Sequence, residues 1–372
     1  KDSASERYIF TQLNPLTKII FNEMDNAVLR YLDDDGTPVE PIYYAPIIPM
    51  CLVNGIKGIG TGFSTYLPCY NPVDITKYVI DYLREGASSV ELTPYYNNFT
   101  GTITKITPSK YMIKGKYEKI ANNKIKITEL PIGTWTDDYK EHLEKLIEQS
   151  KKDGIVKNYI DMSTDKNIDF TILFCNTTIL QTLESNKIDD HCTELEKYLN
   201  LYTTKSTSNM NLFDQNERLV KFNTVEEIIH AYIEQRLKLY TTRIQNIINQ
   251  LNQEVVLLTN KAKYILEVIK GSVDLRNKKG QQIIQLLKDK NYDIINEDKE
   301  YKYLIKLPMD SVSHENVEKL LKKKGDKESE LEVIKNMTNK KMWISELNDL
   351  YKILSTSTMP SSTKKKKLKI AN

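Results

Sequence analysis

The sequence predicts an α+β protein of several domains, because three of its stretches have different residue patterns. Large apolar side chains recur at every second position from Ile168 to Phe174, which indicates a β-strand with one apolar face. From Thr224 to Gly271 apolar residues recur every three or four positions, which indicates one long helix. Between Pro46 and Gly62 prolines and glycines are too dense for a regular helix. At 372 residues, two or three domains are expected.

Composition limits the partners only weakly. The 53 basic and 50 acidic residues leave a formal net charge of +3, so overall charge is weak support for nucleic acid. There is no apolar run of about 18 residues and no secretory-signal pattern at the start, so no membrane segment is predicted. The four cysteines form no C-x-x-C pair, which favours reduced thiols in an intracellular protein. His191 beside Cys192 offers too few ligands for a metal, so no metal site is predicted.

Residues 1 to about 90 are predicted to form a compact mixed region. Leu13 to Phe21 favour a short helix, Asp33 to Gly36 form a turn signal, and Val39 to Tyr44 favour an extended segment. Pro46 and Pro49 make the following apolar run extended or irregular.

Two short stretches of this region could carry chemistry. At Arg7-Tyr8 a phenol beside a guanidinium could attack a phosphate, although residue type alone favours Tyr8 as an ordinary amphipathic aromatic. The glycines from Gly55 to Gly62 allow three interpretations. A nucleotide-phosphate cradle is weakly supported, because no Gly-Lys-Ser/Thr ending is present. The others are a structural turn and a tight loop that presents Ile59 as an apolar wedge between base steps.

Residues 91–222 have strand character. Thr100–Ile106, Tyr111–Tyr117 and Lys124–Thr128 favour further strands, and Thr136 is predicted to cap a helix whose first turn holds two aspartates. The lysines of this region suit either a solvated sheet face or a surface that follows a DNA backbone, and the sequence leaves both open. These lysines are Lys105, Lys110, Lys114, Lys116, Lys119, Lys124 and Lys126.

The last third favours a helical hairpin. Thr224 and Glu227 have the spacing of a capping box. A second helical set, from Ser313 to Leu331 and then from Thr338 to Leu354, can return beside the long helix, with Gly325 expected to break or bend it. The cap between the two arms, about residues 272–312, is expected to have little core of its own and therefore to self-associate. A coiled coil that only spaces or oligomerises fits the same periodicity.

The chain resembles, piece by piece and in order, the breakage-reunion region of eukaryotic-type type IIA DNA topoisomerases. The matching stretches are Lys1–Thr11, Pro41–Pro46, the P-I-I-P-M…N-G…G-I-G-T-G run over Pro46–Gly62, Tyr96–Ile103, Ile127–Pro131, Thr134–Thr136, Tyr139–Glu141, Arg236–Tyr240, Ile265–Glu267, Gly271 and Tyr303–Met309. One departure is Phe63, which stands where relatives commonly carry tryptophan.

The resemblance implies a domain order. Residues 1–90 would be the C-terminal part of a winged-helix domain with the catalytic tyrosine and the intercalating loop, and residues 91–222 a β-rich tower domain. Residues 223–360 would be an antiparallel coiled coil whose cap is the C-gate, the exit gate for transported DNA. Residues 361–372 would be a basic tail.

The resemblance also implies the activity and its residues. Tyr8 would form a 5′-phosphotyrosyl link in a transient double-strand break through which a second duplex passes, and Arg7 would stabilise charge on the phosphate. Ile59 would intercalate, with Gly58 and Gly60 beside it. Lys1 and Ser3 match positions close to the DNA backbone. The implied partners are double-stranded DNA and a second copy of the chain, joined at the C-gate.

In this family Mg²⁺ and ATP are bound by upstream domains that have no match here, so both are expected outside this chain. Because the chain starts within a motif and without methionine, it is expected to be a fragment that alone neither cleaves nor relaxes DNA efficiently.

Two other functions stay open from the sequence. One is a non-catalytic DNA-bridging or scaffold protein that dimerises through its coiled coil. The other is a tyrosine recombinase, which would need several dispersed Arg and His residues around the tyrosine. The Lys-, Asn- and Ile-rich composition is compatible with a large cytoplasmic DNA virus or a protist, so the expected location is the host cytoplasm if the source is viral and the nucleus if it is cellular.

Overall fold

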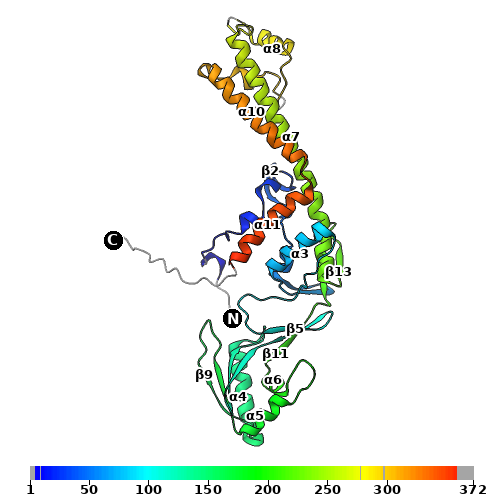
Figure 1. The fold of residues 1–372 in the computed structure, drawn as a ribbon, viewed down its shortest axis with the longest axis vertical. Helices are drawn as coiled ribbons and strands as arrows, with labels where there is room; N and C mark the ends of the chain where they lie inside the picture. Colours follow the sequence, from blue (N-terminus) through cyan, green and yellow to red (C-terminus); the bar gives the residue numbers. More distant parts are fainter. Residues whose placement is uncertain (1–4, 9, 277, 296–297, 358–372) are drawn as a thin grey trace, which may run out of the picture. The chain divides into compact units, whose positions relative to one another are not determined.

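The computed structural model describes residues 5–8, 10–276, 278–295 and 298–357 (Figure 1). The chain divides into two compact units. The first unit comprises Lys1–Ile47 and Glu234–Asp349, and the second comprises Ile48–Ile233 and Leu350–Asn372. The domain boundaries expected from the sequence stay predictions.

The first unit begins with short elements. They are the 3₁₀ helices η1 (Glu6–Tyr8) and η2 (Glu23–Asp25), helix α1 (Thr17–Ile20), and the antiparallel strands β1 (Tyr31–Asp34) and β2 (Thr37–Pro41). Asp35 and Gly36 both have positive φ between β1 and β2, as a two-residue hairpin turn of type I′ requires. The predicted turn is therefore confirmed, whereas the predicted short helix is only the single turn of α1.

The helical hairpin of the first unit is antiparallel. Its helices are α7 (Val225–Ile269), α10 (His314–Lys335) and α11 (Asn339–Ser357), and Figure 1 shows α10 beside α7. Asn339 donates to Thr241 Oγ1 at 3.0 Å, and further along the pair Lys327 Nζ lies 3.1 Å from Glu254 Oε2. The residue numbers on α11 and α10 fall as those of α7 rise, so the two arms are antiparallel and the predicted return of the second arm is confirmed.

Three local details of these helices bear on the predictions. Glu227 N–H donates to Thr224 Oγ1, but the Glu227 carboxylate accepts from the Asn223 backbone, so only half of the predicted capping box forms. Gly271, with φ +72°, follows the end of α7 as expected. Of the break or bend expected at Gly325, the break is wrong, because α10 continues through this residue. The return is interrupted between α10 and α11, where the two predicted helical stretches also separate.

The cap between the arms has a core of its own. It contains α8 (Gly280–Asp289), α9 (Lys302–Ile305) and the 3₁₀ helix η3 (Met309–Ser311). Its buried side chains come from the arms and from the cap: Tyr264, Ile265, Val273, Leu287, Tyr292, Tyr301, Leu304 and Val317. The expectation of a cap with little core is therefore wrong: five of these eight buried residues belong to the cap itself, and the end of α7 and the start of α10 add the other three.

A buried charge network ties the N-terminal segment to the helices of the first unit. Arg236 and Arg243 lie seven residues apart on one face of α7, and both are nearly inaccessible to solvent. Arg236 donates to Asp25 Oδ2 at 2.6 Å, and Arg243 lies 3.5 Å from Asp25 Oδ1 and also donates to Glu346 of α11.

Aromatic side chains complete this network. Burial raises the pKa of the Tyr240 phenol, which stays protonated and donates to Glu346 Oε2 at 2.6 Å. The Tyr240 ring stacks on Trp343, whose indole N–H donates to the Ile47 carbonyl. The segment that precedes Ile47 is thus fastened to both α7 and α11.

The second unit is rich in antiparallel strands. Its elements are α2 (Met50–Asn54), β3 (Ile56–Gly60), β4 (Phe63–Leu67), α3 (Pro72–Glu85), β5 (Thr102–Thr107), β6 (Lys110–Lys114), β7 (Lys116–Ala121), β8 (Lys124–Glu129), α4 (Thr136–Asp153), β9 (Val156–Asp161), β10 (Phe170–Phe174), α5 (Thr177–Ser185), α6 (Glu194–Tyr198), β11 (Tyr202–Ser206), β12 (Met210–Phe213) and β13 (Leu219–Phe222). One sheet has the order β7-β8-β10-β9 and another β11-β6-β5, while β3-β4 and β12-β13 are two-stranded.

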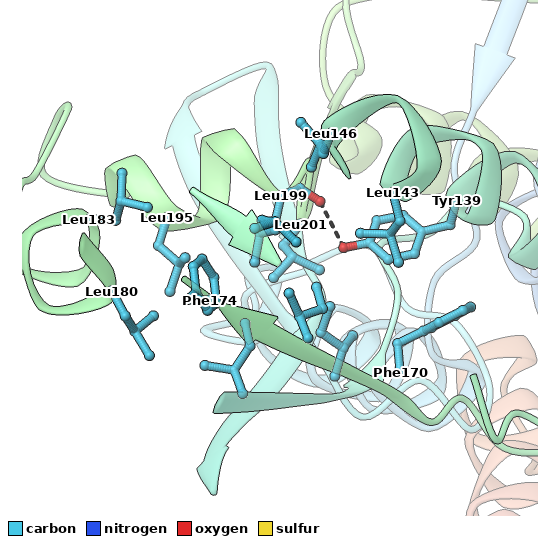
Figure 2. Packing of buried hydrophobic residues seen from close by; sticks show 14 of the residues in the cluster. Tyr139, Leu143, Leu146, Phe170, Phe174, Leu180, Leu183, Leu195, Leu199 and Leu201 are labelled. Atoms are coloured by element: carbon cyan, nitrogen blue, oxygen red, sulfur yellow. Dashed lines mark hydrogen bonds between the residues drawn. The ribbon is translucent and has the colours of Figure 1, made fainter. Parts of the chain in front are cut away.

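The main core of this unit lies between the four-stranded sheet and α4 to α6 (Figure 2). Phe170, Ile172 and Phe174 of β10 are fully buried, which confirms the predicted alternation. Tyr139 of α4 donates to the Leu199 carbonyl at 2.9 Å, and burial raises the pKa of its phenol. The predicted cap at Thr136 is wrong, because Trp135 precedes the helix and Thr136 is its first residue.

The Asp25→Ala substitution tests the charge network. It removes a buried carboxylate that lies against both Arg236 and Arg243, so we expect a loss of about 3–5 kcal/mol in the free energy of unfolding, measured in urea by circular dichroism. Glu234→Ala, also on α7, removes an exposed ion pair with Lys238. It should change the free energy of unfolding by about 0.5 kcal/mol or less. A similar small loss for both variants would contradict the structural role of the network.

Gly325→Ala tests the continuity of α10. A Cβ built at Gly325 has nothing within 4 Å and the residue is helical, so alanine should raise the stability of the hairpin by about 0.5–1 kcal/mol. Gly271→Ala should lower it, because φ +72° strains any residue with a Cβ. Thermal unfolding measures both, and a lower melting temperature for Gly325→Ala would show that the helix does bend or break there.

Candidate nucleic-acid interface

Tyr8 is the last residue of η1 and is displayed to solvent. Its backbone N–H donates to the Ser5 carbonyl at 2.9 Å, which closes the turn, and its side chain is 73% exposed. The Arg7 guanidinium carbon lies 5.0 Å from the centroid of the Tyr8 ring. Two predicted site residues are thus adjacent in space as well as in sequence.

This pair has the groups that binding to a phosphate requires. The exposed Tyr8 hydroxyl can be approached by a bulky substrate, and a planar guanidinium can bind two phosphate oxygens at once. Lys1 and Ser3 lie outside the described residues, so their predicted positions near a DNA backbone stay predictions.

The glycine-rich run forms a β-hairpin. Strands β3 and β4 pair antiparallel, with Ile59 opposite Ser64 and Gly60 opposite Phe63, and Thr61-Gly62 makes the turn. Ile59 therefore lies in a strand next to the turn, rather than on the tight loop that the sequence suggested. The reason is that Gly58 and Gly60 do not adopt positive φ, whereas Gly62 does, at +82°. The strand–turn–strand arrangement also removes the phosphate-cradle alternative, which needs a helix after the loop.

Ile59 is an apolar side chain held in the open. It is 95% exposed, although a hairpin residue of this type ordinarily packs on a neighbour. Beside Gly58 there is open space, and at Gly60 a Cβ would lie 2.7 Å from the Phe63 ring. Gly60 therefore lets the Phe63 ring cover the strand behind Ile59. A protruding apolar side chain on a narrow hairpin has the shape of a wedge.

Lys57 belongs to this candidate site as well, although no sequence motif singled it out. It is two positions before Ile59, so both side chains lie on the same face of β3, and both are exposed. A cation beside an apolar wedge can bind a phosphate next to the opened base step. The sequence places Lys57 two positions before Ile59, but this spacing puts both side chains on one face only if the segment is a strand.

The lysines of the strand-rich region are mostly engaged with carboxylates. Lys114 Nζ lies 2.8 Å from Glu196 with both side chains largely buried, and Lys126 lies 2.8 Å from Asp169. Lys105, Lys116 and Lys119 also lie within 4.0 Å of a glutamate. For these residues the solvated-face alternative is favoured over a surface that follows DNA, because their charge is already partly compensated.

Neither a metal cluster nor a membrane span is found in the part of the chain that the structure describes. Over residues 5–357, outside the gaps given above, no three His, Cys, Asp or Glu side chains are grouped as a metal ion would require. Among the helices of the same residues, none has the length and apolarity of a membrane span.

Comparison with known proteins gives one consistent family. The family model of the DNA gyrase/topoisomerase IV A subunit matches residues 1–348. DNA topoisomerase 2 of Plasmodium falciparum is 34% identical over 379 residues, which cover 93% of this chain and 26% of that protein. The mitochondrial DNA topoisomerase 2 of Dictyostelium discoideum is 32% identical over 366 residues, which cover 96% of this chain and 27% of that protein. This chain thus spans about a quarter of the length of these relatives.

A solved structure agrees with these sequence matches. The crystal structure of the DNA-binding, cleavage and re-ligation domain of Plasmodium falciparum topoisomerase II superposes with a TM-score of 0.77 at 36% identity. The match covers 96% of this chain and 51% of that one. The chain therefore belongs to the type II DNA topoisomerase family, which includes DNA gyrase, topoisomerase IV and the eukaryotic DNA topoisomerases 2.

Proposed function

We propose that residues 1–372 are part of the DNA breakage-reunion core of an ATP-dependent type II DNA topoisomerase. The observation that carries the proposal is the exposed Tyr8 hydroxyl beside the Arg7 guanidinium, in a chain that matches the family over residues 1–348. Membership of the family favours this function over a non-catalytic scaffold, which would not require an accessible tyrosine at this position.

In the proposed reaction, Tyr8 Oη attacks a phosphorus atom of the DNA backbone. The new O–P bond holds the 5′ end, the bond to the 3′ oxygen breaks, and the proton leaves the phenol while the 3′ oxygen gains one. Arg7 stabilises the negative charge that develops on the phosphate oxygens. Because one phosphodiester replaces another, the strand can be resealed by the reverse attack. Two such tyrosines, one from each protomer, would open both strands and let a second duplex pass.

Ile59 and Lys57 are proposed to deform the DNA that Tyr8 cuts. An apolar side chain that enters between base steps unstacks them and kinks the duplex, and the exposed Ile59 gives up little packing when it does so. Lys57 would hold a phosphate beside the opened step. Gly58 and Gly60 have no side chains, so none flanks Ile59 directly along the strand.

We also propose a homodimer joined through the cap at the tip of the hairpin, the C-gate of the family. Because the cap has its own core, the support is the family resemblance together with exposed apolar residues such as Ile294, which is 54% exposed. Mg²⁺ and ATP are proposed to bind outside residues 1–372, in the full-length protein. The proposed location is the nucleus for a cellular source and the host cytoplasm for a viral one.

Tyr8→Phe in the full-length protein tests the nucleophile. Covalent protein–DNA adducts, trapped with denaturant and counted on gels, should disappear because no hydroxyl remains to attack phosphorus. Non-covalent DNA binding should persist, because the ring is kept. Tyr43→Phe, at another exposed tyrosine of the same unit, is the matched control and should form adducts normally. Adducts that persist in Tyr8→Phe would remove Tyr8 from this role and favour the scaffold alternative.

Arg7→Ala tests charge stabilisation. Single-turnover cleavage should slow by about 10²- to 10³-fold, as when one donor to a developing negative charge is lost, with a much smaller change in DNA affinity. Arg7→Lys should recover only part of the rate, because an ammonium cannot bind two phosphate oxygens in a fork. An equal loss in affinity and rate would instead assign Arg7 to DNA binding alone.

A further inference from the structure

The hairpin of β3 and β4 that carries Ile59, called the wedge hairpin below, has few internal contacts that would make it stiff. A two-stranded hairpin is only marginally stable in isolation, and glycines weaken β3 further. Ile59 contributes nothing to the hairpin, because its side chain is in solvent. A wedge must resist the stacking force of the base pairs that it separates, so its support has to come from outside β3 and β4.

That support lies along the outer edge of β4. The segment that leads into β12 runs beside this edge, where the Asn209 carbonyl accepts from the Tyr66 backbone N–H at 2.8 Å. The neighbouring Met210 is fully buried, so β12 is itself anchored in its unit. The edge of the wedge hairpin is therefore covered by a segment that is fixed in place.

Two asparagines converge on the residue opposite Ile59. Asn211 Nδ2 donates to the Ser64 carbonyl at 2.8 Å, and Asn209 Nδ2 donates to Ser64 Oγ at 2.7 Å. Asn211 Nδ2 also donates to Asn209 Oδ1 at 2.8 Å, which joins the two side chains. Ser64 is the cross-strand partner of Ile59, so its side chain lies on the same face of the hairpin as the wedge.

A ring contact holds the turn end of the hairpin. Phe63 packs edge-on against Phe213 with their centroids 6.3 Å apart, and the Phe63 ring also lies against Gly60. Two kinds of contact, polar at Ser64 and aromatic at Phe63, thus fix β4 at the pair that carries Ile59 and at the pair next to it.

We propose that Asn209, Asn211 and Phe213 are positioning residues that clamp the hairpin and hold Ile59 at a fixed angle for entry into DNA. The clamp acts through Ser64 and Phe63 and makes no contact with the reacting phosphate. This inference rests on the wedge role of Ile59 under the proposed function. Without the clamp the hairpin still forms, but it yields when Ile59 meets stacked bases.

The test compares bending with binding in the full-length protein. A short duplex with dyes at its ends and 2-aminopurine at the candidate base step reports the bend by energy transfer and unstacking by fluorescence. Anisotropy measures affinity at the same salt concentration. The variants are Asn209→Ala/Asn211→Ala, Ile59→Ala and the matched control Asn216→Ala, an asparagine of the turn between β12 and β13.

We expect the double variant to lower the ratio of bent to unbent DNA at saturating protein by about tenfold, since it loses two hydrogen bonds to Ser64. Adduct formation should fall in parallel, while affinity and melting temperature stay near those of Asn216→Ala. A fall in affinity without a change in the bend at saturation would overturn the clamp, because that is the result of a merely structural or DNA-contacting role.

The two levels of the proposal fail separately. If Ile59→Ala abolishes the bend and the double variant bends DNA normally, the clamp is wrong and the wedge stands. If Ile59→Ala itself bends DNA normally, the wedge role fails and the clamp falls with it. Should the double variant lose its folded structure, Phe213→Leu gives the same comparison, because it removes only the ring contact of a 64% exposed side chain.

Discussion

The first unit depends on the pairing of Arg236 and Arg243 with Asp25 and Glu346. Each of these guanidiniums is almost wholly buried, and an unpaired buried charge costs several kcal/mol, so α7 can pack only where both carboxylates meet it. One carboxylate comes from the N-terminal segment and the other from α11. The segment that follows Tyr8 is consequently fastened to α7. These ion pairs are directional, so they fix the position of the segment more strictly than apolar packing would.

The wedge hairpin differs from this buried network, because its Ile59 side chain is exposed. The exposed Ile59 side chain adds no burial to the hairpin, and contacts on the far edge of β4 stabilise it instead. Tyr8 is displayed in a comparable way, on a single closed turn that leaves its phenol accessible. In both places local contacts fix the backbone, and the side chain to which we assign a role remains exposed.

In the cap and the strand-rich region, the types of residue present do not by themselves indicate their role. The apolar residues of the cap fill a core within one chain, so they do not by themselves require a partner. The lysines beside glutamates and aspartates are partly neutralised, so a basic-looking strand is not evidence of a DNA surface. In each case the position of a neighbour in space decides the role of the residue.

The sequence by itself determined the long helix of α7, the alternating strand β10, the turn at Asp35-Gly36 and, through an ordered series of motifs, the family. These features depend on local periodicity and on residue types whose backbone preferences are strong. Only the tertiary structure decided that Gly325 continues a helix, that Ile59 lies in a strand, that Lys57 stands beside it, and that Asn209 and Asn211 reach Ser64. The physical reason is distance along the chain: some 145 residues separate the asparagines from Ser64, and no local pattern encodes a contact made by folding.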